Sequence, residues 1–120
     1  MAKIFHIMDK AQWHEVKNNE YYVPESLNTD GFIHCSKADQ ILEVANRLFK
    51  GKPNLVILKI READIQDILK YETPLETPQL PLKYPHIYGP LNTNAIEKAF
   101  DLHPDENGTF KLPKNLLKTS

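Results

Sequence analysis

Three of the five histidines lie within short apolar stretches that are typical of strands. They are His6 in "KIFHIM", His34 in "DGFIHCS" and His86 in "YPHIYG". Burying an imidazole costs free energy unless both ring nitrogens are hydrogen-bonded, so one such histidine is most often a satisfied core residue. Three of them in separate predicted strands indicate a polar cleft, provided that the strands lie side by side.

Strand periodicity determines which side chains can act together with these histidines, because successive side chains point to opposite faces. His34 and Ser36 share one face, and Cys35 takes the other. His86 and Tyr88 also share a face by the same rule. A nucleophilic pair of Cys35 with His34 is therefore disfavoured, and we expect Cys35 to pack as a small hydrophobic residue.

This pattern predicts a polar site that is built on strands. Two strands each offer two polar groups to one side, as a site on rigid elements requires. One alternative is a buried hydrogen-bond network that fixes strand register. Another is a zinc site made of three imidazoles, but no H-x-H or H-x-x-x-H spacing supports it, and we expect no metal. The predicted site residues are His6, His34, Ser36, Glu72, His86 and Tyr88.

Short strands and helices alternate along the chain. Apolar runs and period-two alternation predict strands over four segments, 2–9, 32–36, 53–60 and 86–91, and a final edge strand over 108–113. Helical spacing and capping residues predict helices over 10–19, 39–51, 61–71 and 92–100, with Ser36 as N-cap of the second and Asn92 or Asn94 of the last. Because the strands are short and the connections vary, the pattern favours an α+β domain over a doubly wound parallel sheet.

Composition indicates one ordinary globular domain over residues 1–120. The chain is 41% hydrophobic and 26% charged, with a formal net charge of -1, so no overall field would attract nucleic acid or an anionic membrane. Charges at Lys3, Asp9 and Lys10 interrupt the first segment and disfavour a signal peptide or a membrane span. A single cysteine cannot form an internal disulfide. We therefore expect a cytoplasmic monomer whose partner is a small molecule.

Several sequence words resemble the small bacterial family known as domain of unknown function 952. They are "IFHI" near the N-terminus, "DGFIHCS" with the following Gln40, "LKYE" ending at Glu72, and above all "YPHIYGPL", together with Trp13. The resemblance covers nearly the whole chain, from the first strand to the segment after "YGPL". Arg61 departs from the pattern, because the family usually shows an acidic residue after that strand.

The fold of this family is similar to that of ADP-ribosyltransferases. The resemblance therefore implies a mixed split β-sheet with flanking helices, which holds NAD in a cleft. In those enzymes a histidine on the first strand contacts ribose hydroxyls, an aromatic ring stacks on nicotinamide, and a glutamate orients the ribose. His6 resembles the first of these residues, and Tyr88 and Glu72 are the candidates for the other two, although neither stands in a transferase motif.

The resulting expectation is an NAD-dependent transfer of an ADP-ribosyl group. We expect Glu72, His34 and His86 to be catalytic, and His6, Ser36 and Tyr88 to bind NAD or a related nucleotide. No G-x-G-x-x-G or P-loop occurs among the four glycines, so a nucleotide would not be held in the Rossmann manner. Two alternatives stay open: a small-molecule-binding module without turnover, and a metal-dependent enzyme whose metal is held by histidines.

Overall fold

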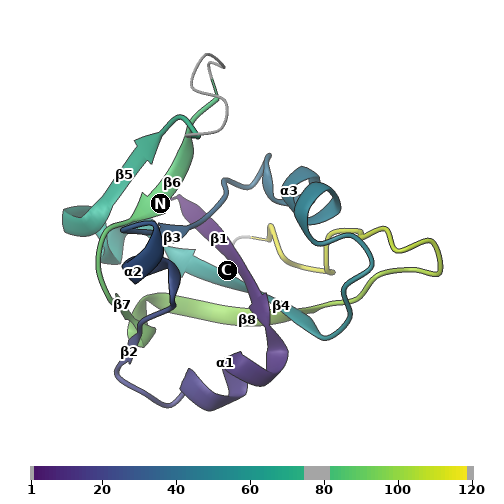
Figure 1. Ribbon diagram of the computed structural model, residues 1–120, viewed down its shortest axis with the longest axis horizontal. Coiled ribbons are helices and arrows are strands. Elements are labelled where there is room, and N and C mark those ends of the chain that lie inside the picture. The colour runs from purple at the N-terminus through teal and green to yellow at the C-terminus, as the bar shows by residue number, and fades with distance from the viewer. Residues whose placement is uncertain (1, 75–81, 119–120) are drawn as a thin grey trace.

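The computed structural model describes residues 2–74 and 82–118, and these residues form an α+β fold built on antiparallel sheets (Figure 1). One sheet has the strand order β1-β4-β8, a second has the order β3-β6-β5, and β2 and β7 form a two-stranded ribbon. The helices are α1 (Lys10–Val16), α2 (Ser26–Thr29) and α3 (Ile41–Leu48). The strands are β1 (Lys3–Asp9), β2 (Tyr21–Tyr22), β3 (Ile33–His34), β4 (Leu55–Arg61), β5 (Leu69–Glu72), β6 (Tyr84–Ile87), β7 (Leu91–Asn92) and β8 (Ile96–Leu102).

The central sheet is organised around β4, which is hydrogen-bonded to β1 on one side and to β8 on the other. A continuous apolar run suits such a strand because both of its faces are covered. Ile4 and Leu58 belong to the hydrophobic core on one face, and Phe5 and Ile57 belong to the core on the opposite face. The strands predicted over 2–9 and 53–60 are confirmed, as is the alternation of their side chains.

The second sheet is connected to β1 through Ser36. The backbone N–H of Phe5 donates to the carbonyl of Ser36 at 2.9 Å, and the N–H of Ser36 donates back to the carbonyl of Phe5 at 2.8 Å. Just before Ser36, β3 pairs with β6 and sets His34 opposite His86. Every strand pairing within the described ranges is antiparallel, so the mixed sheet that the resemblance implied is not found there.

α3 begins later than predicted, and Ser36 is not its N-cap. Ser36 is held in an extended conformation by its two backbone bonds to β1, so Gln40 takes the position before the helix. The Gln40 side chain accepts a hydrogen bond from the Lys37 N–H at 2.9 Å and donates to the Lys83 carbonyl at 2.9 Å. The start of α3 thereby anchors the segment that leads into β6.

The helix predicted over 92–100 is wrong, because most of this segment forms β8. The Asn92 side chain does accept a bond from the N–H of Asn94 at 2.9 Å, but it caps only a 3-10 turn, η3 (Thr93–Ala95). From Ile96 onward the chain pairs with β4, with one register shift between Lys59 and Ile60. The apolar spacing suits a helix, but the second edge of β4 needs hydrogen-bond partners, and that tertiary requirement overrides the local preference.

Two further expectations near the chain's second half are also corrected. The segment 61–71 forms two 3-10 turns, η1 (Glu62–Asp64) and η2 (Gln66–Ile68), and then enters β5. Residues 108–113 form no strand, because the backbone of Phe110 is hydrogen-bonded to the side chain of Asn46: its N–H donates to Oδ1 at 2.7 Å, and its carbonyl accepts from Nδ2 at 3.3 Å. No helix in residues 2–74 and 82–118 is long and apolar enough to cross a bilayer.

Candidate functional site

A pocket with a volume of about 400 Å³ opens on the second sheet. Its size lies within the usual range for sites that bind small molecules. β5 and β6 form its base: His86 pairs with Lys70, so Glu72 lies diagonally across from His86 on the neighbouring strand. The residues that line the pocket are Phe32, Tyr71, Glu72, Thr73, Lys83, His86 and Tyr88.

The carboxylate of Glu72 is the polar centre of the pocket. Its Oε1 accepts a hydrogen bond from the Tyr88 hydroxyl at 2.5 Å and another from Nδ1 of His86 at 2.8 Å. Both bonds lower the pKa of Glu72 below its usual value, and the bond from Tyr88 makes the larger contribution. The same bond raises the pKa of Tyr88. Glu72 is therefore an anion at neutral pH, and its second oxygen has no partner among the described residues.

The bond to an ionised carboxylate also fixes the tautomer of His86. A carboxylate only accepts hydrogen bonds, so Nδ1 of His86 carries a proton, and in the neutral ring Nε2 carries the lone pair. No described residue donates to this Nε2. His86 is thus a buried histidine, 6% exposed, that retains one acceptor nitrogen for a ligand.

An aromatic wall stands beside the carboxylate. The ring of Phe32 stacks on that of His86, with 3.9 Å between centroids and an interplanar angle of 20°. Tyr88 belongs to the same cluster, with 5.4 Å between its ring centroid and that of Phe32. Stacked rings of this kind are held by burial and by π-system geometry and form a rigid surface for a planar group.

Two lysines bring positive charge to the site. Lys83 lines the pocket, and the ammonium of Lys70 lies 5.1 Å from the centroid of the Tyr88 ring, within the range of a cation–π contact. The pocket therefore combines a planar wall, one carboxylate and nearby ammonium groups. A ligand with a ring, hydroxyl groups and an anionic arm would match all three features.

His34 lies at the rim of the pocket rather than in its lining. Its ring is 4.6 Å from that of Phe32 and 5.8 Å from that of His86, measured between centroids, and its side chain is 54% exposed. Nε2 of His34 is bonded to Oδ2 of Asp30 at 2.7 Å. The structure thus brings four predicted residues into one cluster, Glu72, His86, Tyr88 and His34.

The other two predicted residues lie outside the pocket lining. His6 donates from Nδ1 to the carbonyl of His34 at 2.6 Å, and its Nε2 is bonded to the Tyr22 hydroxyl at 2.9 Å. Desolvation lowers the pKa of His6 to about 4, so this ring is neutral at physiological pH. Ser36 is buried at 3% exposure and bridges the two sheets through its backbone. His6 supports the site indirectly, because its bond to the carbonyl of His34 holds the backbone of β3 in place.

Sequence reasoning did not single out four of the pocket residues: Phe32, Tyr71, Thr73 and Lys83. Alternation along "FIHCS" indicates that Phe32 shares the face of His34, which was the available signal. The Asp30-Gly31 pair predicts a turn, and the sequence carries no signal for a contact between Asp30 and His34. Cys35 lies on the opposite face in the core, as predicted, and burial raises the pKa of its thiol. No group of three histidine, cysteine, aspartate or glutamate side chains in residues 2–74 and 82–118 is arranged to hold a metal ion.

The geometry can be compared with known proteins. Residues 7–99 match the family described as "Protein of unknown function (DUF952)". The chain belongs to this family. Among the curated proteins, none matches the chain.

Solved structures of one bacterial protein are similar over nearly the whole length. The crystal structure of CC0527 from Caulobacter crescentus is 30% identical in sequence, with a TM-score of 0.82, and the similarity covers 95% of this chain and 97% of that one. The solution NMR structure of CC0527 is 29% identical, with a TM-score of 0.77, and the similarity covers 96% and 94%. The DUF952 chain described here therefore shares its fold with CC0527.

Proposed function

We propose that this pocket binds a nucleotide that carries a ribose and a planar ring, with NAD as the first candidate. The observation that carries the proposal is the anionic carboxylate of Glu72, held by His86 and Tyr88 beside the Phe32 wall. The second oxygen of the carboxylate would accept hydrogen bonds from ribose hydroxyls. The aromatic cluster would take the ring, and the lysines would attract the phosphates.

We further propose that the bound nucleotide undergoes ADP-ribosyl transfer. The bond between C1′ of the ribose and the nicotinamide nitrogen breaks, and nicotinamide leaves with the electron pair. The ribose then carries developing positive charge, as in other glycosidic cleavages. A fixed carboxylate next to it stabilises that charge at little cost in reorganisation. Glu72 fits this role because its two hydrogen bonds hold it in place and keep it ionised.

The resemblance of the DUF952 family to ADP-ribosyltransferases supports the same proposal. Those enzymes have a split sheet that holds NAD in a cleft. Here the pocket lies on the sheet β3-β6-β5, which joins β1 of the central sheet through the Ser36 bridge. Under this proposal Tyr88 is the aromatic residue nearest to nicotinamide, and Glu72 is the ribose-orienting glutamate.

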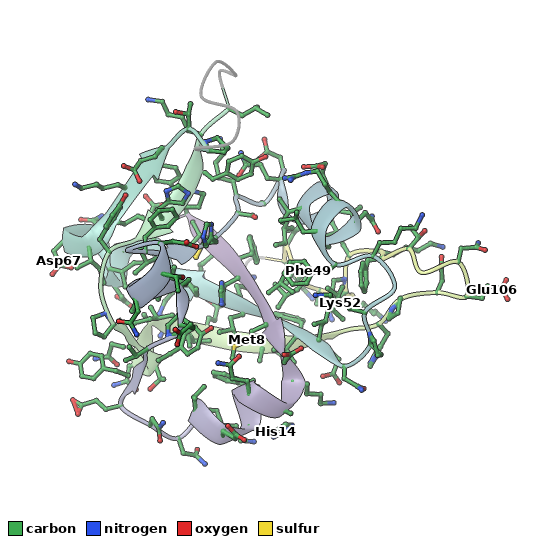
Figure 2. All side chains as sticks on the ribbon, in the orientation of Figure 1. Met8, His14, Phe49, Lys52, Asp67 and Glu106 are labelled. Carbon is green, nitrogen blue, oxygen red and sulfur yellow. The ribbon has the colours of Figure 1, made fainter. Side chains whose placement is uncertain are left out.

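The test has a binding step and a turnover step. Isothermal titration and thermal shift with NAD, ADP-ribose and nicotinamide measure binding, and a ligand at 100 times its Kd should stabilise the fold by about 2.7 kcal/mol. Release of nicotinamide measures turnover. The Glu72→Gln variant should bind NAD but lose turnover by about 100-fold or more, because the amide cannot stabilise positive charge. Glu106→Gln is the matched control, since Glu106 is exposed at the tip of the loop that follows β8 (Figure 2).

Absence of any interaction with NAD and ADP-ribose at millimolar concentration would remove the basis of the proposal. A second candidate function is a binding module without turnover. The two hydrogen bonds that Glu72 accepts from His86 and Tyr88 favour it, since such a network also keeps a binding site rigid. In that case NAD binds to the wild type and to Glu72→Gln, and neither releases nicotinamide.

A further inference from the structure

A second histidine–carboxylate pair lies at the rim of the pocket. Nε2 of His34 and Oδ2 of Asp30 are 2.7 Å apart. The two side chains are 54% and 45% exposed, and a polar side-chain pair this exposed contributes at most about 1 kcal/mol to stability. Stabilisation of the fold is therefore a weak reason for this arrangement.

Local backbone geometry brings the two residues together. Asp30 ends α2, where its N–H donates to the carbonyl of Ser26 at 2.8 Å. Gly31 follows with φ of 87°, a left-handed conformation that reverses the chain at no steric cost to glycine. The chain then enters β3, and the side chain of His34 meets that of Asp30 four residues earlier.

The orientation of His34 is fixed at both its side chain and its backbone. The Asp30 carboxylate accepts, so Nε2 of His34 carries a proton, and in the neutral ring Nδ1 carries the lone pair. No described residue hydrogen bonds to Nδ1. The carbonyl of His34 accepts a bond from His6 at 2.6 Å, and His6 is held in turn by Tyr22. A histidine with one nitrogen oriented by a carboxylate and the other available for a proton is the arrangement of a general base.

The two histidine–carboxylate pairs face each other across the β3–β6 pairing. His34 and His86 are opposite residues in the register, and their rings are 5.8 Å apart with an edge-on angle of 70°. Glu72 is bonded to His86 inside the pocket, and Asp30 is bonded to His34 outside it. Under the proposed function, the His86–Glu72 pair would act on the ribose, and the exposed His34–Asp30 pair at the rim would face an acceptor that enters from solvent.

From this geometry we infer that His34 is the general base that activates the acceptor hydroxyl, and that Asp30 is its positioning residue. This inference rests on the proposed function. The acceptor, water or an alcohol, attacks C1′ as the bond to nicotinamide breaks. Its oxygen forms the new bond to C1′, its proton passes to Nδ1 of His34, and nicotinamide departs with the electron pair. The proton is then released to solvent, so the step needs no other reactant.

The charged and titratable groups around His34 come from four elements. Asp30 faces it from the end of α2, and the neutral His6 of β1 contacts its backbone. His86 of β6 faces its ring and leads to Glu72 of β5. Protonation of His34 removes the base, so the transfer rate should fall on the acid side.

The test compares four variants of the full chain. His34→Gln removes the base, and Asp30→Ala removes its positioning residue. His14→Gln and Asp67→Asn are the matched controls, because both residues are exposed, His14 on the outside of α1 and Asp67 at the outer edge near β5 (Figure 2). Nicotinamide release with water or an alcohol acceptor is measured over pH, NAD affinity by titration, and the ring tautomer of His34 by ¹⁵N NMR.

We expect His34→Gln to lose about 100-fold or more in rate, the lower end of general-base contributions, and to lose the acid limb of the pH profile. Asp30→Ala should lose about tenfold and convert the Nε2–H tautomer of His34 into a mixture. NAD affinity should stay within about twofold in both variants, since neither residue lines the pocket. The two controls should match the wild type.

Unchanged release in His34→Gln, with NAD bound and turnover present in the wild type, overturns this inference and leaves the proposed function standing. An unchanged His34 tautomer in Asp30→Ala overturns the role of Asp30, and this result does not depend on NAD. If the wild type binds NAD without releasing nicotinamide, both transfer and the base are refuted, and the binding module remains.

Discussion

His6 should make the stability of the fold depend on pH in a range where few carboxyl groups titrate. Its ring donates to the His34 carbonyl and is bonded to the Tyr22 hydroxyl. The bond from Tyr22 needs the neutral imidazole, because Nε2 accepts it, and burial of the ring favours the same neutral form. Replacing His6 by glutamine keeps an amide that can hydrogen bond but removes the titration. We therefore expect His6→Gln to weaken the pH dependence of folding stability.

The size of the effect follows from the two pKa values of His6, about 4 in the folded protein and 6.5 as the model value for an unperturbed histidine. Because the folded pKa is the lower one, the unfolded state takes up a proton first as the pH falls. The free energy of unfolding is therefore highest above pH 6.5 and declines towards pH 4. Between pH 7.5 and pH 5.0 the linkage amounts to about 2 kcal/mol, and partial exposure of the ring reduces it towards about 1 kcal/mol.

Urea denaturation at pH 7.5 and pH 5.0 measures this difference. Trp13 is the single tryptophan and packs against the core, so its fluorescence reports unfolding. The pKa values of Glu72 and Glu97 are lowered by their hydrogen bonds, and such groups destabilise the fold only as the pH approaches their usual range and falls below it. The chosen window therefore isolates the histidines, and His14→Gln controls for the loss of an exposed one.

The wild type and His6→Gln should differ in how much free energy of unfolding they lose between these two pH values. The wild type should lose about 1–2 kcal/mol on moving from pH 7.5 to pH 5.0, whereas His6→Gln should lose clearly less. An equal loss in both proteins would mean that His6 is not the neutral, desolvated group that its contacts indicate. A matching result for His14→Gln and the wild type completes the control.

Three other predictions concern the core and a turn. Cys35 is buried and burial raises the pKa of its thiol, so we expect no reaction with Ellman's reagent at pH 8 until denaturant is added, and rapid modification of the native protein would contradict this. Leu58→Ala removes a fully buried side chain of β4 and should lower the free energy of unfolding by about 2–5 kcal/mol, whereas Leu82→Ala at an exposed site should stay within about 0.5 kcal/mol, both by urea titration. Gly51 has φ of 79°, so Gly51→Ala should cost about 1–2 kcal/mol in the same assay, and no loss would show that the turn relaxes.

Part of the candidate site could be predicted from the sequence, because the alternation of side chains along a strand is a local property. Alternation along a strand assigns Phe32 and His34 to one face and Cys35 to the other, whatever the rest of the chain does. It cannot say which strand lies beside which. Glu72 reaches His86 only because β5 pairs with β6 in a register that brings residues 14 apart in sequence into contact.

His6 and Ser36 show the limit of pattern reasoning. Both stand in strand-like surroundings near the pocket residues, but long-range bonds engage them elsewhere. His6 is held between Tyr22 and the His34 carbonyl, and Ser36 is paired with Phe5. The type and spacing of a polar residue do not reveal whether its hydrogen-bonding groups are already satisfied by the fold.

By itself, the sequence of this protein determined the α+β class, the two strands β1 and β4, the split of Cys35 from His34, and membership of a family marked by the words around His34 and His86. These features depend on local periodicity and on short words. Tertiary structure alone decided that the segment after Asn92 forms a strand and that Glu72 meets His86 and Tyr88. The physical reason is that unpaired strand edges and buried polar groups must find partners, and those partners lie far along the chain.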